Sequence, residues 1–384
     1  MFQLIHYVEV ADDKDSFIEV PFISDITIEK SISNLADTAN ITVSIFNFNN
    51  LIKTEDDVMF YKIFKRGQRI RIFLGYEPTL RLEFVGYVKE IRTNDDVMKL
   101  ECEDELFQFR EKKIPNKTFT PGNVKQIVNH VARLVNKKIK VICDYDMGYE
   151  KFTIIDATGY DVLKQIQEDT GADIYFKSKL SSQIGQTIET DDINYSSQLS
   201  GKELQITSNN SIAPDDTLEL HISAPFIKKN TDVDCDFSFQ HNIETSQLQY
   251  EDSKDNKVQV KITSVSISGV NVTEEFGSTG GTVKEIKVNR MSKESMKKRA
   301  KLEHEKATRP QYSGTFDSWL IPFVEPNYSI SIEDEDFPEK AGIYNVESVT
   351  TSYSEAGGKR TITPSFKLSK DINGSNKTKN EKQN

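Results

Sequence analysis

Cysteine and long apolar runs are both scarce in this sequence of 384 residues. The three cysteines, Cys102, Cys143 and Cys235, lie far apart and form no C-x-x-C pair, so the pattern favours neither a disulfide framework nor a zinc site. We expect buried thiols in a reducing compartment. No stretch approaches the ~18 apolar residues of a membrane span. The N-terminus has neither the basic region nor the cleavage site of a signal peptide, so none is expected.

Basic charge is also in short supply. The chain has 49 basic against 60 acidic residues, a net charge of −11. Proteins that grip nucleic acid need a basic stripe for the phosphates, and no segment supplies one. We therefore expect no specific nucleic-acid binding and no membrane insertion. The C-terminal tail is the exception, because its lysines outnumber its acidic residues.

Known catalytic motifs are incomplete wherever they begin. His304-Glu305 starts a helical zinc-protease motif, but Thr308 stands where the second histidine is required. The loop Gly277–Gly281 lacks the Lys-Ser/Thr pair of a phosphate-binding loop, and a flexible hairpin loop is the better interpretation.

Acidic residues do not form a recognisable site either. The run Glu333–Asp336 lacks the spacing of a calcium loop and predicts an exposed acidic turn. Glu101 and Glu103 alternate with apolar neighbours, so we assign them to the solvent face of a strand and not to a pair of catalytic carboxylates. We predict that the chain is not an enzyme, with no catalytic residue, no cofactor site and no metal site.

Aromatic residues are plentiful, with 22 Phe and 14 Tyr, which excludes disorder of the whole chain. Near both ends, apolar residues alternate with polar ones between turn signals, as at Ile70 and Ile72, which is typical of antiparallel strands. We predict a mainly β fold in which two similar antiparallel β-barrel domains flank a small α+β insert. The expected domains are a first barrel over residues 1–107, the α+β insert over 108–232, a second barrel with one charged helix over 233–368, and a disordered tail over 369–384.

In the insert the apolar period becomes helical. Thr120-Pro121 predicts the N-cap and first residue of a helix that continues with apolar residues at i, i+3, i+4 and i+7. A second helix is expected to begin at Thr158 and to end at Gly171. The segments Val124–Ile127 and Leu163–Ile166 are similar, which predicts two related helix–strand halves.

A second internal similarity links the two ends of the chain. Residues 66–91 parallel residues 325–349. In both, a turn residue opens a strand, which carries Ile70 or Ile330; an acidic loop follows, and a glycine, Gly86 or Gly342, opens the next strand. The similarity predicts that one barrel unit is used twice.

The order of these segments resembles the tail hub (baseplate hub) proteins of phages, the late control protein D family, whose fold is shared by the N-terminal region of type VI secretion spike proteins. The resembling pieces are ISDITIEKSISNLADTANITVSIFN, FKRGQRIRIFLGY, FVGYVKEI, LECEDELFQFRE, DATGYDVLKQIQEDTGADIYFKSK, VQVKITSVS, MKKRAKLEHEKATRPQYSGTF and AGIYNVESVTTSYSEAGGKRTITPSFKL.

The resemblance implies a virion structural protein of a phage tail or a related contractile injection system, made in the host cytoplasm and placed in the tail or baseplate. Three chains, each with two similar barrels, would form a homotrimeric ring of pseudo-sixfold symmetry that adapts a sixfold tail tube to a threefold spike. The implied partners are a tail tube protein, a separate spike protein and other baseplate proteins. An acidic channel wall would let DNA or other cargo pass without adhering.

Two other functions stay open from the residues alone. The helix–strand insert could be a LysM-like module of a cell-wall glycan-binding protein, which exposed aromatic residues on that domain would favour. An acidic-pair glycosidase would need a pocket with two carboxylates, and the sequence identifies no such pair. For the hub, the candidate assembly surface is Arg69 and Arg71, which alternate outward from the apolar residues of their strand.

Overall fold

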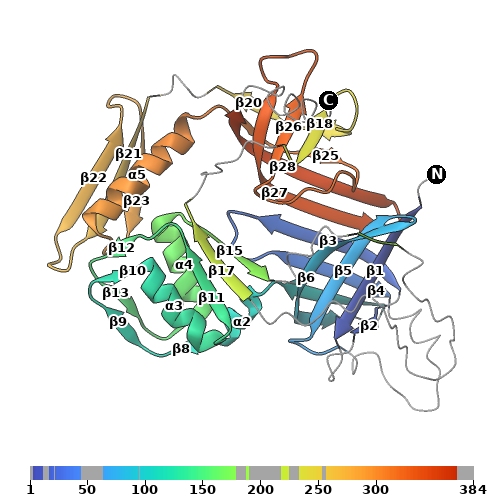
Figure 1. Cartoon of the computed structure of the whole chain (residues 1–384), viewed down its shortest axis with the longest axis horizontal. Helices are drawn as coiled ribbons and strands as arrows, with labels where there is room; N and C mark the ends of the chain where they lie inside the picture. The colour runs from blue at the N-terminus through green and yellow to red at the C-terminus, as the bar shows by residue number, and fades with distance from the viewer. Residues whose placement is uncertain are drawn as a thin grey trace, which may run out of the picture.

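The computed structural model describes residues 3–11, 17–20, 22–44, 64–94, 96–178, 187–189, 218–224, 233–252 and 257–369. These residues form a mainly β structure with an α+β part, as the sequence predicted. Figure 1 shows an N-terminal β unit in blue, an α+β unit in green and a C-terminal β unit in red, with a further sheet and helix in orange beside the α+β unit. Parts of the insert and the predicted disordered tail, from residue 370 on, lie outside the described residues.

The N-terminal β unit follows the predicted alternation. Ile70 and Ile72 are fully buried in a core with Ile26, Ile41 and Leu100, because every second residue of each strand faces inward. The strands are β1 (Leu4–Ala11), β2 (Phe17–Glu19), β3 (Ile23–Ser31), β4 (Thr38–Ser44), β5 (Arg69–Tyr76), β6 (Thr79–Thr93), β7 (Val97–Glu103) and the short β16 (Thr187–Glu189), which pairs with β6.

The C-terminal β unit has its own core, built from aromatic and aliphatic residues such as Phe237, Phe316, Ile330, Tyr344 and Ile362. Its strands are β18 (Cys235–Ser238), β19 (Thr245–Ser246), β20 (Gln249–Glu251), β24 (Gln311–Ser313), β25 (Phe316–Ser318), β26 (Ser329–Glu333), β27 (Gly342–Ser354) and β28 (Gly357–Ser369).

The α+β unit contains the two predicted helix–strand halves. Its central sheet has the order β11-β17-β15, with β17 parallel to β11 and antiparallel to β15. The elements are α2 (Leu106–Glu111), β8 (Lys113–Ile114), β9 (Lys117–Phe119), β10 (Gly122–Asn123), α3 (Val124–Val135), β11 (Ile139–Cys143), β12 (Gly148–Tyr149), β13 (Phe152–Ile154), β14 (Ala157–Thr158), α4 (Gly159–Thr170), β15 (Asp173–Ser178) and β17 (Leu218–Ser223).

The start of α3 was placed wrongly. Its N-cap is Asn123, whose side chain accepts a hydrogen bond from the backbone N–H of Gln126, and not Thr120. The predicted start and end of α4 are confirmed: Thr158 caps it in a capping box, and Gly171 ends it with φ 64°. The matched segments occupy different positions in their helices. Val124–Ile127 is the first turn of α3, whereas Leu163–Ile166 follows the first turn of α4.

Residues 258–308 pack differently from the prediction. The sequence assigned them to the second barrel, whereas Val260, Ile262 and Met296 share the core of α3 and α4. The elements are β21 (Val258–Val265), β22 (Asn271–Gly277), β23 (Thr282–Val288) and the predicted charged helix α5 (Lys293–Thr308). The reason for this packing is that the inner face of the β21–β23 sheet is apolar and packs against α5. The apolar residues of this sheet and helix then continue into the core of the α+β unit.

The Gly277–Gly281 loop is not a hairpin. The strand order is β22-β21-β23, with β23 parallel to β21, so the loop crosses the end of β21 to reach its other edge. A Cβ on Gly281 would lie 1.7 Å from the carbonyl oxygen of Lys257, which explains the glycine at this crossing.

Asp169 ties α4 to the segment that leads into α5, and its titration gives a testable pH dependence. Its carboxylate accepts a hydrogen bond from the backbone N–H of Asn289 at 3.0 Å, and burial raises its pKa to about 6. A raised folded-state pKa stabilises the fold fully below the unfolded pKa of ~4, and this contribution is lost as pH rises through 6. We expect Asp169→Asn to raise Tm at pH 8, by the equivalent of about 1–3 kcal/mol, and to change it little at pH 4.

Asp161 is the matched control with the opposite sign. Hydrogen bonds from Thr158 hold its pKa below the usual range. Asp161→Asn should therefore lower Tm at pH 8 and have a diminishing effect as pH falls through the range in which the carboxylate protonates. Calorimetry of both variants at pH 4 and 8 checks the pair; Tm shifts of the same sign at pH 8 would contradict the assignment.

Candidate functional site: the joint between the two β units

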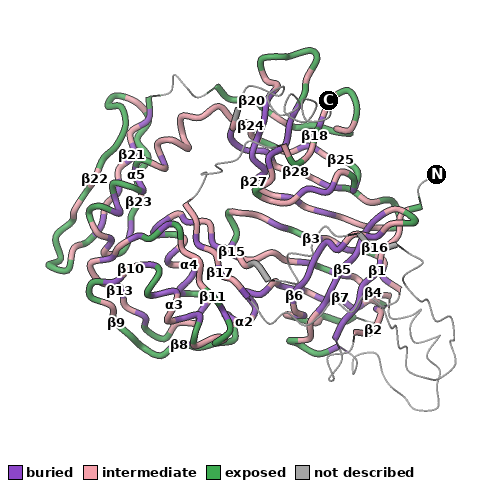
Figure 2. The backbone as a smooth tube through the Cα atoms, in the orientation of Figure 1, coloured by how far each residue is buried: buried purple, intermediate pink, exposed green. Residues whose placement is uncertain are grey.

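The two β units are connected by strand pairing. Along one edge of β27, its first residues pair with β26 and Ser348–Ser354 pair with Ser31–Asp25 of β3. We call this β3–β27 pairing the joint. Figure 1 shows the strands side by side where the red and blue units meet, and Figure 2 shows buried residues running through both. The joint makes one continuous sheet of the two units.

A buried ion pair reinforces the joint. Arg360 of β28 and Glu83 of β6 are 1% and 3% exposed, and their side chains form two hydrogen bonds of 2.8 and 3.1 Å. Arg360 also donates to the carbonyl of Leu320 and to the hydroxyl of Thr351, both at 2.9 Å. A charged side chain that is removed from water needs such hydrogen bonds and an opposite charge. Each β unit therefore supplies the ionic partner of a buried charge in the other unit.

A second charged pair crosses the joint beside the first. Lys30 of β3 donates to Glu325 at 2.6 Å. Burial alone would lower the pKa of Lys30, but the carboxylates of Glu325 and Asp37 raise it overall. Burial raises the pKa of Asp37 to about 6, although Lys30 opposes the shift. The geometry of the joint therefore pairs opposite charges that come from the two β units.

The two β units repeat one strand order. Neighbouring strands run β3-β4-β7-β6-β5-β1 in the N-terminal unit and β19-β25-β28-β27-β26-β18 in the C-terminal unit. Corresponding strands also occur in the same order along the chain, so that β6 corresponds to β27 and β3 to β19. The two units differ in the direction of the last strand, since β1 runs antiparallel to β5, whereas β18 runs parallel to β26. The similarity between residues 66–91 and 325–349 is therefore part of a repeated six-stranded unit.

Hydrogen bonds repeat at the turn before the first strand of each repeated hairpin. Gly67 N–H donates to the carbonyl of Val88 at 2.7 Å, and Asn327 N–H donates to that of Val346 at 2.8 Å. Both donors have left-handed backbone, with φ 89° and 72°. Both valine N–H groups donate back to the residue that follows the donor, at 2.9 Å. The equivalence thus extends to single residues.

A β-bulge follows at the same place in both units. The register of β6 against β7 skips Lys89, and the register of β27 against β28 skips Glu347. The pairs after the bulge correspond as well: Ile91 lies opposite Leu100, as Val349 lies opposite Ile362. Bulges re-aim a strand, so both units bend at the same point.

Arg69 and Arg71 alternate with buried isoleucines as predicted, but their side chains bond within the chain. Arg71 is 6% exposed, pairs with Glu9 of β1 and lies over the ring of Phe17 at 3.6 Å. Arg69 pairs with Glu105 and lies 4.9 Å over the ring of Tyr87. Reversing either charge would break an ion pair within the chain and so would disturb the fold of the unit. Their role as an assembly surface therefore stays a prediction that charge reversal does not test.

Glu103 does not lie on a solvent face. It is fully buried, and its carboxylate accepts from Arg110 at 2.5 and 2.7 Å, with Lys89 at 3.7 Å. Glu101 lies two residues earlier in β7; it is partly exposed and pairs with Arg92 at 3.1 Å. The alternation was correct, but α2 supplies Arg110 and covers this end of the strand.

The remaining candidate site residues, those of His304-Glu305 and of the acidic run Glu333–Asp336, are not brought together into one site. His304 packs edge-on against Phe276, and Asp334 caps an acidic turn by accepting from the backbone N–H groups of Asp336 and Phe337. Across the described residues, no group of three or more His, Cys, Asp or Glu is placed to hold a metal ion. None of the helices in this part of the chain is long and apolar enough to cross a membrane.

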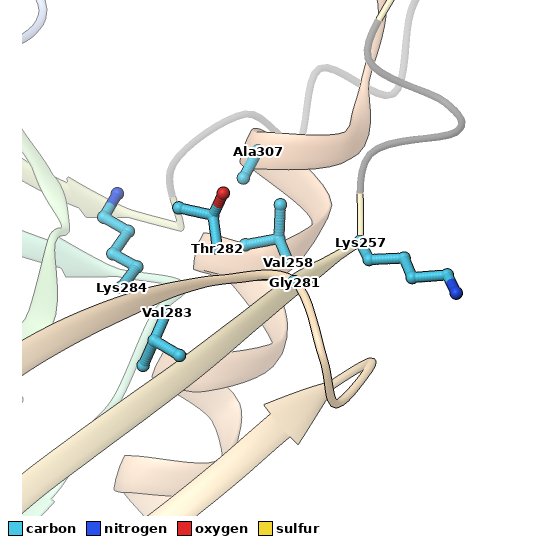
Figure 3. Close-up of a pocket in the computed structure, with 7 residues that line it drawn as sticks. All are labelled: Lys257, Val258, Gly281, Thr282, Val283, Lys284 and Ala307. Carbon is cyan, nitrogen blue, oxygen red and sulfur yellow. The ribbon is translucent and has the colours of Figure 1, made fainter.

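A shallow hollow of about 580 Å³ lies between α5 and the ends of β21 and β23. In Figure 3 the side chains of Lys257 and Lys284 point away from each other, and Lys284 is engaged by Glu303. The hollow therefore has no converging polar groups to bind a ligand.

Sequence reasoning missed the residues that matter most at the joint, Glu83 and Arg360. They are 277 positions apart in the sequence, so no local pattern connects them. The only available signal was a charged residue inside the apolar run Leu82–Val85, where a charge needs a partner.

Comparisons with known proteins rest on structure. The sequence matches no family model, and no curated protein matches it. The tail protein from Neisseria meningitidis MC58 has a TM-score of 0.58 at 11% identity, over 94% of this chain and 96% of that chain. The 43 kDa tail protein of prophage MuSo2 from Shewanella oneidensis has a TM-score of 0.53 at 14% identity, over 94% and 96%.

A chain of the lidded PdpA-VgrG complex of Francisella has a TM-score of 0.52 at 10% identity, and the match covers 96% of this chain but 53% of that one. The chain therefore has the fold of phage tail proteins and of a chain of this VgrG complex. This is the fold that the family resemblance predicted.

Proposed function

We propose that the protein is a structural hub of a phage tail or related injection machine. Three chains form a ring of pseudo-sixfold symmetry that joins a sixfold tail tube to a threefold spike and leaves an axial channel. The observation that carries the proposal is the repeated six-stranded unit, since it gives one chain two equivalent surfaces. Three such chains match a partner with six equivalent subunits.

The proposed role is mechanical and not catalytic. Its partners are a tail tube protein, a separate spike protein and other baseplate proteins, and the assembled ring lies in the tail of the virion after synthesis in the host cytoplasm. The paired charges at the joint support a load-carrying connection, since they hold the two units in one orientation. In the proposed domain division the two ring units are the N-terminal and C-terminal β units, and residues 258–308 belong with the α+β unit, whose core they share.

The net charge of −11 supports an acidic channel wall, which repels DNA and so prevents adhesion during passage. A ring whose channel is lined mainly by lysine and arginine would contradict this part of the proposal. The glycan-binding alternative gains no such support. In the described part of residues 108–178, the exposed large apolar side chain is Ile155, and the aromatic residues are buried or half-buried.

We expect the purified chain, at high concentration or with a tube protein, to form trimeric rings with an axial hole. Light scattering measures the mass, and negative-stain electron microscopy shows the ring and its pseudo-sixfold outline. The control is Lys164→Ala, which changes an exposed residue of the α+β unit and leaves both ring units intact. It should form the same rings as the unchanged chain. A chain that stays monomeric with and without tube protein would refute the hub function.

A further inference from the structure

Among the described residues, one strand edge in each β unit pairs with no other strand. In the C-terminal unit, the edge of β27 after its bulge holds β3 at the joint. The corresponding edge of β6 is Lys89–Thr93, on the side away from β7. In the described part of the chain no strand pairs there, since the pairing of β5 with β6 ends at Arg69 opposite Tyr87, and β16 lies on the β7 side, at Thr79–Arg81.

At this edge a side chain, that of Arg66, donates the hydrogen bond that a backbone N–H donates at the joint. At the joint, the carbonyl of Glu347 accepts from the backbone N–H of Ile32, which follows β3. At the corresponding bulge of β6, the carbonyl of Lys89 accepts from Nε of Arg66 at 2.9 Å. The carbonyl that accepts from the segment after β3 in one unit thus has an equivalent in the other, where Arg66 is its donor.

The complementary edge is formed by β19 and β20. These strands correspond to β3, because Thr245 lies opposite Asp317 of β25 as Asp25 lies opposite Thr42 of β4. β19 is the last strand on its side of the large sheet, and Thr245–Glu251 is mostly exposed. Among the described residues its outer edge pairs with nothing, whereas β3 is paired on both edges.

These two edges do not pair with each other within the described part of the chain. Along the large sheet, β25, β28, β27, β3, β4 and β7 separate β19 from β6. At ~4.8 Å for each strand the separation is on the order of 30 Å. Open edges are templates for pairing with another chain, and two different edges pair head to tail. A second copy of this chain can therefore present to each edge the strand that it lacks.

We propose that Thr245–Glu251 of one copy pairs antiparallel with Lys89–Thr93 of the next, reproducing the joint between chains. The residue correspondence fixes the register. At the joint, Thr350 lies opposite Glu29; the equivalent residues place Arg92 of one chain opposite Gln249 of the next. Intrachain and interchain joints then alternate around the ring. This inference rests on the proposed ring and names its contact surface.

Engineered disulfides test the register. In a background with Cys102→Ala, Cys143→Ser and Cys235→Ser, the variants Arg92→Cys and Gln249→Cys are made separately and mixed under mild oxidation. Both residues are exposed, so neither change disturbs a core. Opposed residues of paired strands lie ~4.5–5.5 Å apart, within reach of a disulfide. We expect a covalent dimer from the mixture, and covalent trimers from the double variant.

Two controls fix the meaning of the result. Glu29→Cys with Thr350→Cys in one chain should form an intrachain bond, which shows that the joint geometry and the folded state support cross-linking. Arg92→Cys mixed with Lys164→Cys, an exposed position on α4, should give no dimer.

Absence of the Arg92–Gln249 dimer, even at millimolar chain concentration, overturns the proposed contact. If rings still form by electron microscopy, the hub function stands while the contact surface is wrong. If the dimer forms but no ring or tube complex does, the contact stands and the hub function fails.

Discussion

Arg360→Met should destabilise the protein more than any exposed charge change. It leaves the Glu83 carboxylate buried without its partner, and removing one member of a buried pair costs about 3–5 kcal/mol. The carbonyl of Leu320 and the hydroxyl of Thr351 lose a donor in the same step. We expect a fall in Tm measured by calorimetry, with earlier exposure of both β units to protease.

The double variant Arg360→Met with Glu83→Leu separates the pair from the packing. It removes the unpaired charge, so it should recover a large part of the lost stability. Lys113→Ala, which breaks the exposed ion pair with Asp156, is the comparison for an ordinary surface charge and should change stability by less than about 1 kcal/mol. Equal effects of Arg360→Met and Lys113→Ala would show that the joint does not depend on the buried pair.

Gly86→Ala should prevent β6 and β7 from pairing normally. A Cβ at this position would lie 2.4 Å from the carbonyl oxygen of Glu103 and 2.7 Å from the ring of Phe84. The carbonyl belongs to the backbone of the neighbouring strand and cannot rotate away, so strands in the core must separate. We expect insoluble protein, or a loss of about 3 kcal/mol or more in urea unfolding, at the high end for point substitutions.

Gly148→Ala is the matched control, because its Cβ would come no closer than 3.2 Å, to the hydroxyl of Ser292. A hydroxyl can turn aside, so the change in unfolding free energy should be small. A soluble Gly86→Ala protein with the unfolding midpoint of Gly148→Ala would contradict the close packing of β6 on β7.

Gly86 and its equivalent in the C-terminal unit, Tyr344, fill the same part of the core in two different ways. Gly86 lies opposite Ile70 in the first unit, and Tyr344 lies opposite Ile330 in the second. The aromatic ring over the core comes from Phe84 in the first unit and from Tyr344 itself in the second. Sequence comparison aligned Gly86 with Gly342, two residues from its structural equivalent, because glycine is the most visible signal in a short segment.

Local patterns predicted the elements well, since they depend on neighbours in the chain. Alternation identified the strands that carry Ile70 and Ile330, and capping chemistry located both ends of α4. The same patterns misplaced the cap of α3, because Asn123 follows Thr120-Pro121 within one turn and either side chain can cap a helix.

Burial of charge could not be predicted from the same patterns. Arg71 and Glu103 stand at polar positions of alternating strands, which normally face water. In the structure β1 and α2 place Glu9 and Arg110 over them. Whether a polar position is wet depends on what another segment brings to it.

The sequence by itself determined a mainly β chain in which one unit occurs twice, because strand periodicity and turn residues are local properties. Only the tertiary structure decided how the units connect. The pairing of β3 with β27, the buried contact of Glu83 with Arg360, and the packing of residues 258–308 on the α+β unit join segments that are distant in sequence. Such contacts depend on which edges and faces remain uncovered after the local elements form, and no pattern within one segment records that.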